Sequence, residues 1–471
     1  MAGMRSVVAI TLLLAGCGGN GLFGGDVPVD DNLSSDFDRL DVGAISEDEG
    51  VVPWLDDLLS EDERPVEGQR KIGLFLPLSG TYAPLGKLLS DTAQMALFDF
   101  ASENVDILPF DVGSGEEGKA EAAIIEAIDA GVEVIAGPLF AHSVDAIDND
   151  AISKNIPVVS FSSDASFARK GVFIMGYRVE EEVQRVIGYA RRRGFVRYAL
   201  LAPNTPYGQL IDETMVEATD VYDANYTRTL LFDGKVRDAA SDVELFSDYQ
   251  KRENFIQGQL QAFELDEEEK EDQILINEVR DMSSLPFDAI MIPLQGQDLV
   301  SAVAFLAFYD VTNSRVRFLG TSLWEGDELL REPLLNGSWF AAPDIALRQA
   351  FREKFVSVFQ RQPPRVASIV YDTVALLVQL MSGTERLSLK RLTNPSGFEG
   401  VNGLFRLHED GTVQRSYNIY QVQNGALEVV GRGRSSFDGG TAAAVSTLTD
   451  GTAEGTTEGA TGAGDPETTA E

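Results

Sequence analysis

The chain of 471 residues contains a single cysteine, Cys17, and only two histidines. One thiol excludes an intrachain disulfide framework and a metal site with several cysteine ligands. His142 and His408 lie 266 positions apart, so the sequence gives little support for a His-rich metal site or a Ser-His-Asp triad. Basic residues are also scarce, because 38 Lys and Arg face 75 Asp and Glu, for a formal net charge of -37. Nucleic acid and anionic lipid headgroups are therefore poor partners for this protein.

A short apolar stretch, Val7 to Leu14, follows Arg5 and leads through two small residues to Cys17. About eight apolar residues are too few to cross a bilayer as a helix, which takes roughly 20. A cationic residue, a short apolar core and small residues before a cysteine are typical of a bacterial lipoprotein signal. We therefore expect cleavage before Cys17 and lipidation of its thiol. The alternative is an ordinary secretory signal that happens to contain a cysteine. Gly18, rather than Asp, at the next position is similar to the sorting pattern for the periplasmic face of the outer membrane.

Two segments have the composition of disordered chain. Residues 18–70 hold fifteen Asp and Glu against three arginines, and we predict an acidic disordered tether there. Residues 436–471 are rich in Gly, Thr and Ala, with seven acidic and no basic residues. Such a segment cannot bury enough apolar surface to order itself, so we predict a second disordered tail.

Between these segments, short apolar runs alternate with segments of helical apolar spacing. Lys71 to Leu76 (KIGLFL) is almost continuously apolar, as expected for a strand buried on both faces of a parallel sheet. Successive strand-helix-strand units give doubly wound α/β layers. The predicted strands are Lys71–Leu76, Asp106–Phe110, Val132–Ala136, Ile156–Phe161, Tyr198–Ala202, Thr227–Phe232, Ala289–Ile292 and Val316–Leu319. The predicted helices are Leu85–Ala101, Lys119–Ala130, Val144–Ile152, Glu181–Arg193, Phe351–Phe359 and Ser368–Leu380.

The pattern predicts an α/β protein with two lobes, each a doubly wound parallel sheet with flanking helices. We assign residues 71–180 and about 328–400 to the first lobe, and residues 181–327 to the second lobe. The charged stretch 233–286 predicts a solvated helical hairpin inserted in the second lobe, with an acidic docking surface as the alternative. Residues 401–435 are expected to form a C-terminal hairpin and crossover, in which Tyr417–Val422 pairs back across the turn at Asp410-Gly411.

Six segments in this order resemble the type I periplasmic binding protein fold: KIGLFLPLSGTYAPLG, VIAGPLF, IPVVSFSSDAS, APNTPYG, FDAIMIP and GFEGVNGLFRLHEDG. More narrowly they are similar to lipoproteins called penicillin-binding protein activators, which in turn resemble leucine/isoleucine/valine-binding proteins. The resemblance implies a non-enzymatic protein without a cofactor that works in peptidoglycan synthesis with a penicillin-binding protein, that is, a bifunctional peptidoglycan synthase. The alternative implied by the same fold is a substrate-binding lipoprotein that delivers an amino acid or a related small molecule to an ABC permease.

Ligands of open α/β sheets sit beyond the carboxyl ends of the strands, where loops expose backbone N–H groups and hydroxyls. In the resembling fold these loops of the two lobes face each other across a cleft. For each hydroxyl there, a helix N-cap or turn role is the alternative to ligand binding. The candidate cleft residues are Ser79, Tyr82, Leu139, Phe140, Ser143, Ser160, Ser162, Ser163, Asn204, Thr205, Tyr207, Gln295, Asp298, Trp324 and Asp327.

Amino-acid binders of this superfamily place an acidic residue of the second lobe against the ligand ammonium. After the strand FDAIMIP this chain has Leu294-Gln295-Gly296-Gln297-Asp298, so that Asp298 or Asp327 would have to serve. The segment Gly113 to Gly118 (GSGEEG) formally matches a dinucleotide-binding fingerprint. Its two adjacent glutamates would repel a pyrophosphate, and we set this interpretation aside. Nothing in the chain singles out a pair of carboxylates for hydrolysis.

Overall fold

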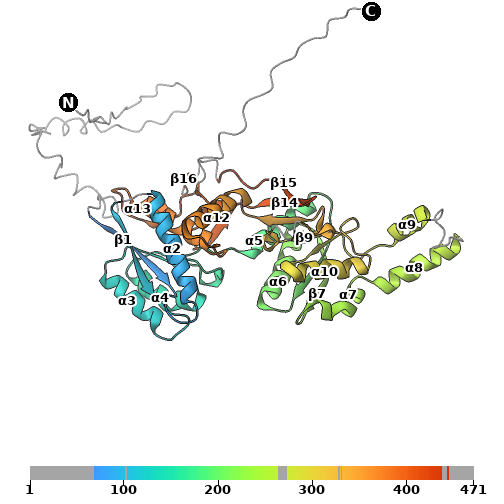
Figure 1. The fold of residues 1–471 in the computed structure, drawn as a ribbon, viewed down its shortest axis with the longest axis horizontal. Helices are drawn as coiled ribbons and strands as arrows, with labels where there is room; N and C mark the ends of the chain where they lie inside the picture. Colours follow the sequence, from blue (N-terminus) through green and yellow to red (C-terminus); the bar gives the residue numbers. More distant parts are fainter. Residues whose placement is uncertain are drawn as a thin grey trace, which may run out of the picture. The chain divides into compact units, whose positions relative to one another are not determined.

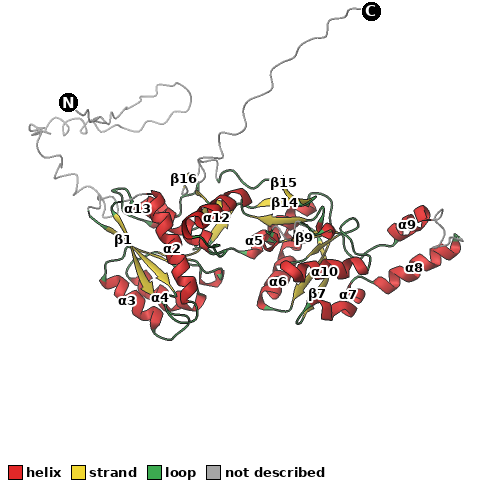
Figure 2. Ribbon diagram, viewed as in Figure 1, coloured by secondary structure: helices red, strands yellow, loops and turns green. Residues whose placement is uncertain are grey.

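The computed structural model describes residues 68–100, 103–263, 273–326, 329, 331–437 and 443–444. They form two sheets of mainly parallel strands with helices on both faces, and one small mixed sheet (Figures 1 and 2). This confirms the predicted fold class. No helix in these ranges is long and apolar enough to cross a membrane. Cys17, residues 18–67 of the predicted tether and almost all of the predicted C-terminal tail lie outside the described residues. The predicted boundaries were slightly too wide, because Arg70 is the buried first residue of a strand and Phe437 is buried as well.

The first sheet has the strand order β2-β1-β3-β4-β5, and every neighbouring pair is parallel. Its central strand β1 reads RKIGLFL and is buried along nearly its whole length, as its apolar sequence predicts. The five strands are β1 (Arg70–Leu76), β2 (Val105–Asp111), β3 (Val134–Ala136), β4 (Val158–Ser160) and β5 (Val172–Ile174).

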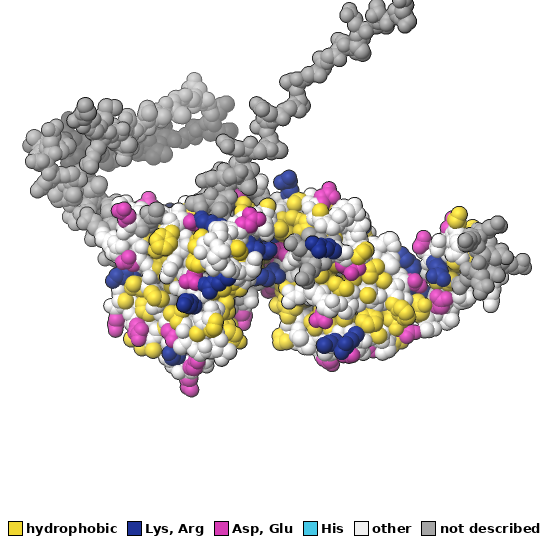
Figure 3. Space-filling view, viewed as in Figure 1, with side chains coloured by type: hydrophobic (Ala, Val, Ile, Leu, Met, Phe, Trp, Pro, Cys, Tyr) yellow, Lys and Arg dark blue, Asp and Glu magenta, His cyan; other side chains and the backbone are white. Residues whose placement is uncertain are grey.

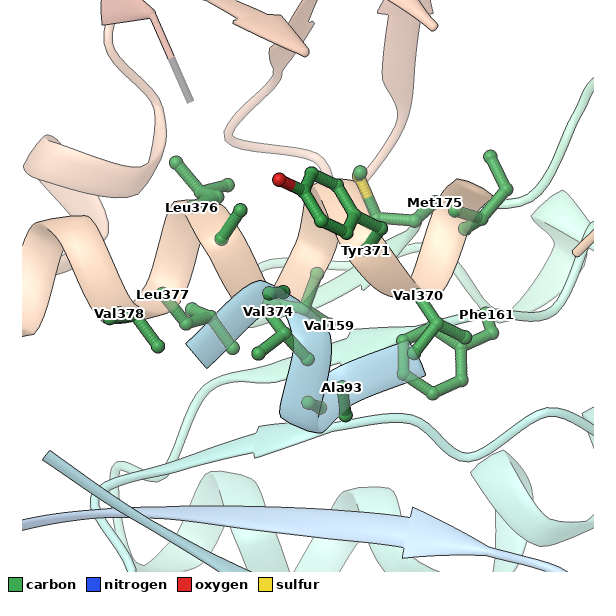
Figure 4. Close-up of a cluster of buried hydrophobic side chains, with 14 of the residues drawn as sticks. Ala93, Val159, Phe161, Met175, Val370, Tyr371, Val374, Leu376, Leu377 and Val378 are labelled. Carbon is green, nitrogen blue, oxygen red and sulfur yellow. The ribbon is translucent and has the colours of Figure 1, made fainter. Parts of the chain in front are cut away.

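Different helices cover the two faces of the first sheet. Helices α3 (Lys119–Asp129) and α4 (Ala141–Ser153) share one hydrophobic core with it. Helices α2 (Ala83–Phe100), α12 (Ile345–Phe359) and α13 (Ala367–Met381) share the other. In Figure 4, α13 lays Val370, Val374 and Leu377 over Ala93 of α2 and Phe161. The last two helices thus return to the first sheet, as the sequence predicts.

The second sheet has the strand order β15-β14-β10-β9-β8-β6-β7. Five strands are parallel and the two C-terminal ones are antiparallel. Helices α5 (Val179–Arg191) and α6 (Pro206–Val221) pack in one core, and α10 (Gly296–Phe308) packs in the core of the other face. The strands are β6 (Arg197–Pro203), β7 (Asn225–Phe232), β8 (Ala289–Met291), β9 (Arg317–Gly320), β10 (Trp339–Ala342), β14 (Asn418–Gln423) and β15 (Ala426–Gly431).

Two predicted connections near the C-terminus differ from the structure. Strand β10 belongs to the second sheet, so the predicted boundary near residue 328 placed this segment in the wrong lobe. The turn at Asp410-Gly411 joins β12 (Gly403–Leu407) to β13 (Val413–Arg415), not to the strand at 417–422. That strand is β14, which pairs with β10 and β15 instead. The small sheet is completed by β11 (Phe398–Gly400) and β16 (Ala443–Ala444).

The charged stretch between β7 and β8 is helical. It contains the short 3-10 helix η3 (Val236–Ala239), α7 (Ala240–Phe246), α8 (Tyr249–Ala262) and α9 (Gln273–Met282). Helices α8 and α9 bury a small core of their own, made of Ile256, Leu260, Ile276 and Val279. The acidic run 264–272 lies outside the described residues.

Candidate functional site

A cavity of about 590 Å³ opens among loops that belong to both large sheets. Most of its lining is apolar, with a few hydroxyls and charged groups. Its walls are formed by Leu85, Leu139, Phe140, Ala141, Phe161, Ser162, Ser163, Asp164, Gly176, Tyr177, Val179, Glu182, Tyr207, Ser322, Leu323, Arg365, Val366 and Ile369.

The strand ends of the two sheets explain why these residues meet. Three stretches follow the carboxyl ends of β3, β4 and β5 in the first sheet, namely 139–141, 161–164 and 176–177. Tyr207 follows β6 and Ser322 follows β9 in the second sheet. Loops beyond the carboxyl ends of parallel strands are where open α/β sheets bind ligands. The cavity therefore lies where the topology places a binding site.

Five of the predicted cleft residues line this cavity, and four of them come from the first sheet: Leu139, Phe140, Ser162 and Ser163. Tyr82 lies beside them, because its ring packs on Phe140 with 4.9 Å between the ring centroids. The aromatic rings and Leu139 give this wall an apolar surface, and the two serines supply hydroxyl groups.

From the second sheet, the predicted residue Tyr207 lines the cavity. Its hydroxyl lies 3.4 Å from Oγ1 of Thr321, and burial raises the pKa of Tyr207 to about 12. The phenol is therefore neutral at physiological pH and can act as a hydrogen-bond donor or acceptor.

The other predicted residues lie outside the cavity lining, and several have structural roles. Ser160 donates to the carbonyl of Pro138 at 2.8 Å, and Thr205 caps α6 by accepting from the N–H of Gly208. Trp324 is 1% exposed and donates to the carbonyl of Ile292, so it belongs to the core of the second sheet. Thr205 thus has the N-cap role that was its alternative, whereas the core position of Trp324 differs from its predicted place in the cleft.

The remaining predicted positions are distributed over the surface and the first-lobe core. Ser143 is buried in α4, and Ser79 carries a backbone N–H that donates to Asp111. Asn204, Gln295 and Asp298 are exposed and do not line the cavity. Asp327 and Cys17 lie outside the described residues. Within the described ranges, Asp298 is thus not placed to meet a ligand in this cavity.

Glu182 is the principal cavity residue that sequence reasoning missed. It is 2% exposed, and its carboxylate accepts from the backbone N–H and from Oγ of Ser322, both at 2.7 Å. Burial raises the pKa of Glu182 to about 7, against the lowering effect of these two hydrogen bonds. A signal was available in the sequence: Glu182 shares the apolar face of α5 with Val179, Val183 and Val186 at helical spacing.

Arg365, also missed, contributes a cation to the cavity. Its Nη2 donates to Oγ of Ser322 at 2.7 Å, and its guanidinium lies 5.9 Å from the ring centroid of Tyr177. Arg365 precedes α13, which packs on the first sheet, whereas Ser322 follows β9 of the second. The hydrogen bond therefore joins elements of both sheets.

Asp164 places a second carboxylate at the cavity. It is exposed, and one of its oxygens, Oδ1, accepts from the N–H and from the hydroxyl of Ser166. The cavity thus presents an exposed carboxylate and an exposed guanidinium around an apolar lining. Such a set can hold a ligand that carries both charges on an apolar body.

In the loop that matches the dinucleotide fingerprint, backbone N–H groups donate hydrogen bonds to carboxylates of this chain. The carboxylate of Asp111 accepts from the N–H groups of Leu78, Ser79 and Gly113 at 2.9–3.0 Å. Although burial acts in the opposite direction, these hydrogen bonds and the one with Lys119 lower the pKa of Asp111. Within the fingerprint itself, the N–H of Gly113 thus donates to Asp111 and the N–H of Ser114 donates to Glu116, so both amides are occupied by the chain's own carboxylates. In the described ranges, no group of three or more His, Cys, Asp or Glu is placed to hold a metal ion.

Comparison with known proteins gives the same fold. The family model described as periplasmic binding protein matches residues 69–241. An uncharacterized protein of Rickettsia prowazekii is 26% identical over 145 residues, which are 31% of this chain and 38% of that protein.

Solved structures cover more of the chain. A Rhodospirillum rubrum protein provisionally assigned as a branched-chain amino acid ABC transporter is 16% identical, with a TM-score of 0.59, over 77% of this chain and 100% of its own. A branched-chain amino acid ABC transporter periplasmic ligand-binding protein from Burkholderia xenovorans is 15% identical, with a TM-score of 0.56, over 78% and 96%. A substrate-binding protein from Desulfitobacterium hafniense, solved with Leu, is 15% identical, with a TM-score of 0.50, over 77% and 100%. These chains are binding proteins rather than enzymes, and this protein has the two-lobed, leucine-binding-like fold of the type I periplasmic binding proteins.

Proposed function

We propose that this protein binds a small molecule in the cavity between its two large sheets and delivers it to an ABC permease at the cell envelope. The single observation that carries the proposal is the cavity itself, whose lining includes residues that follow the carboxyl ends of five parallel strands. The similar structures described as ABC transporter binding proteins support it.

The lining favours an amino acid or a related molecule with an apolar side chain. Phe140, Leu323 and Ile369 offer apolar contact, and the rings of Tyr177 and Tyr207 add aromatic surface. Burial of such a side chain contributes about 25 cal/mol per Å² of apolar area. A volume of about 590 Å³ falls within the usual range for small-molecule sites, roughly 300–1,000 Å³.

The charged groups of the cavity can each bind one end of such a ligand, its carboxylate or its ammonium group. Arg365 is exposed and can give a ligand carboxylate a charge-assisted hydrogen bond. Asp164 can accept from a ligand ammonium, in the role for which the sequence offered only Asp298 and Asp327. Glu182 is less suited to it, because its oxygens already accept two hydrogen bonds from Ser322.

Isothermal titration with leucine, isoleucine, valine and their decarboxylated and deaminated analogues tests the proposal. We expect heat for at least one amino acid, and at least about tenfold weaker binding in Arg365→Gln and in Asp164→Asn. Arg361→Gln is the matched control, because Arg361 lies four residues away, pairs with Asp91 and does not line the cavity. Equal affinities in all three variants would place the ligand elsewhere.

A second candidate function is the penicillin-binding protein activator role, and the helical insertion favours it. Helices α8 and α9 expose Phe255, Ile274, Leu275 and Met282 by 44–72%, although the cavity does not use this segment. Contiguous exposed apolar patches mark protein-contact surfaces. These four side chains come from two helices that pack on each other. Capture of a purified bifunctional peptidoglycan synthase should then fall with Phe255→Ser/Ile274→Ser and persist with Arg365→Gln. If the Phe255→Ser/Ile274→Ser variant captures as much synthase as the Arg365→Gln variant and the wild type, the result argues against this role.

The lipid anchor at Cys17 is part of both proposals. A Cys17→Ser variant should lose incorporation of labelled fatty acid and leave the membrane fraction. If the wild-type protein is secreted into the periplasm without incorporating labelled fatty acid, the ordinary secretory signal is supported instead.

A further inference from the structure

A second cavity, of about 500 Å³, shares no lining residue with the one described above. It lies where the start of α5, the end of β13 and the chain after β15 come together. Its walls are formed by Glu181, Gln184, Arg185, Arg192, Tyr222, Gln414, Arg415, Ser416, Tyr417, Arg432, Gly433 and Arg434.

The charge of this cavity is opposite to that of the protein. It gathers five arginines and one carboxylate in a chain whose formal net charge is -37. On the face of the molecule drawn in Figure 3, acidic and basic side chains are interspersed instead. Arg192, Arg432 and Arg434 are exposed, and none of them forms an ion pair with another described residue. The cavity therefore concentrates positive charge that its own surroundings do not neutralise.

Hydrogen bonds to backbone carbonyl groups hold the side chain of Arg185 in place at this cavity. Nε of Arg185 donates to the carbonyl of Tyr417 at 2.9 Å, and its Nη2 donates to the carbonyl of Arg432 at 2.8 Å. These bonds attach α5 to the segments before β14 and after β15. Burial first, and then repulsion by Arg192 and Arg434, lower the pKa of Arg185. The like charges thus lie close enough to act on one another.

The one carboxylate compensates this charge only in part. Oε2 of Glu181 accepts from the backbone N–H of Arg415 at 3.3 Å, and burial raises the pKa of Glu181 to about 7. Near neutral pH the carboxyl is therefore partly protonated. The hydrogen bond of Glu181 goes to the backbone of Arg415, and the exposed guanidinium groups of Arg432 and Arg434 form no ion pair with a described residue.

From this arrangement we infer that the second cavity is a binding site for a small anion with at least two negative charges, of the phosphate class. Guanidinium groups form bidentate, charge-assisted hydrogen bonds with such oxyanions. The site is separate from the ligand cavity, so that its occupancy does not depend on the proposed function. The chain also carries anions that could compete for this site, because the sequence after Phe437 has seven Asp and Glu residues.

Isothermal titration of the full chain with inorganic phosphate and with pyrophosphate at low ionic strength tests the inference. Replacement of the exposed pair, Arg432→Gln/Arg434→Gln, should weaken binding at least about tenfold. The double variant Lys235→Gln/Arg237→Gln removes the same charge from exposed positions elsewhere and should change affinity less than about twofold. Equal losses in the two variants would mean general charge attraction and would overturn the site.

A third protein distinguishes the two sources of the anion. In the full chain with the seven acidic residues after Phe437 changed to amides, tighter phosphate binding than in the wild type means that the chain's own carboxylates compete for the site. Unchanged affinity means that the site takes a free anion. If neither this protein nor the wild type binds phosphate or pyrophosphate, the inference is wrong.

Discussion

Replacing Glu182 with glutamine should change how the stability of this protein depends on pH. Glu182 is almost fully buried, and burial raises its pKa to about 7 in the folded protein from the ordinary value of 4.5. The folded state therefore keeps a proton on this carboxyl in a pH range where the unfolded state has lost it. By linkage, the contribution of Glu182 to stability is full below about pH 4.5, declines as the pH rises to about 7, and is absent above that.

The size of the effect follows from the pKa difference. Each pKa unit corresponds to about 1.4 kcal/mol, so the shift of Glu182 amounts to about 3 kcal/mol. Glutamine has a similar shape and can still accept from the N–H of Ser322, but it has no proton to lose. The free energy of unfolding of Glu182→Gln, minus that of the wild type, should thus rise by about 3 kcal/mol between pH 4.5 and about pH 8.

Urea unfolding followed by tryptophan fluorescence measures this difference. The described tryptophans are Trp339, whose ring contacts Tyr189 of α5, and Trp324, which lies in the core on the other face of the second sheet. Exposed Glu213 on α6 provides the control, and Glu213→Gln should keep the pH profile of the wild type. A difference between Glu182→Gln and wild type that stays constant within about 0.5 kcal/mol across the pH range would refute the reasoning.

Three further substitutions test the packing around the cavity. Leu376→Ala in α13 removes a fully buried side chain and should lower the free energy of unfolding by about 2–5 kcal/mol in urea titrations, whereas a loss below about 1 kcal/mol would contradict the packing in Figure 4. Arg348→Met leaves the partly buried Glu325 without its ion partner and should cost about 3 kcal/mol, and adding Glu325→Gln should recover most of it in thermal unfolding. Gly176→Ala places a Cβ at 2.6 Å from Cα of Ser163, so its melting temperature should fall, and an unchanged value would exclude this close approach.

The strands that the sequence predicts correctly are those with enough apolar residues to show a pattern. Long β1 and β6 are found to within a residue, because burial on both faces requires a continuous apolar run. The short strands β5 and β10, of three and four residues, were not predicted. Length alone does not explain this, because β3, β4 and β8 have three residues each and were predicted as parts of longer segments. Strand β14 could be recognised, but its partner could not, because pairing with β10 is fixed by contacts 80 positions apart in the chain.

Some residues of the cavity were predicted from the sequence and others were not. Loops at strand ends were predicted from topology, which is why Leu139, Phe140 and Tyr207 are among those that line the cavity. Glu182 and Arg365 come from the starts of helices whose placement depends on the packing of both lobes. Sequence spacing can put Glu182 on a buried face, but it cannot show that Ser322 faces it across 140 positions of the chain.

The hydrogen bonds of Ser322 bear on how a ligand would bind. Its hydroxyl is shared between Glu182, which is buried, and Arg365, which is exposed. An exposed guanidinium exchanges one hydrogen-bond partner for water or for a ligand at little net cost, whereas a buried carboxylate that loses its donors is destabilised by several times that amount. A ligand carboxylate can therefore recruit Arg365 while the bond between Ser322 and Glu182 stays in place. Glu182 then acts on the ligand only by holding Ser322, and removing its charge should affect stability more than affinity.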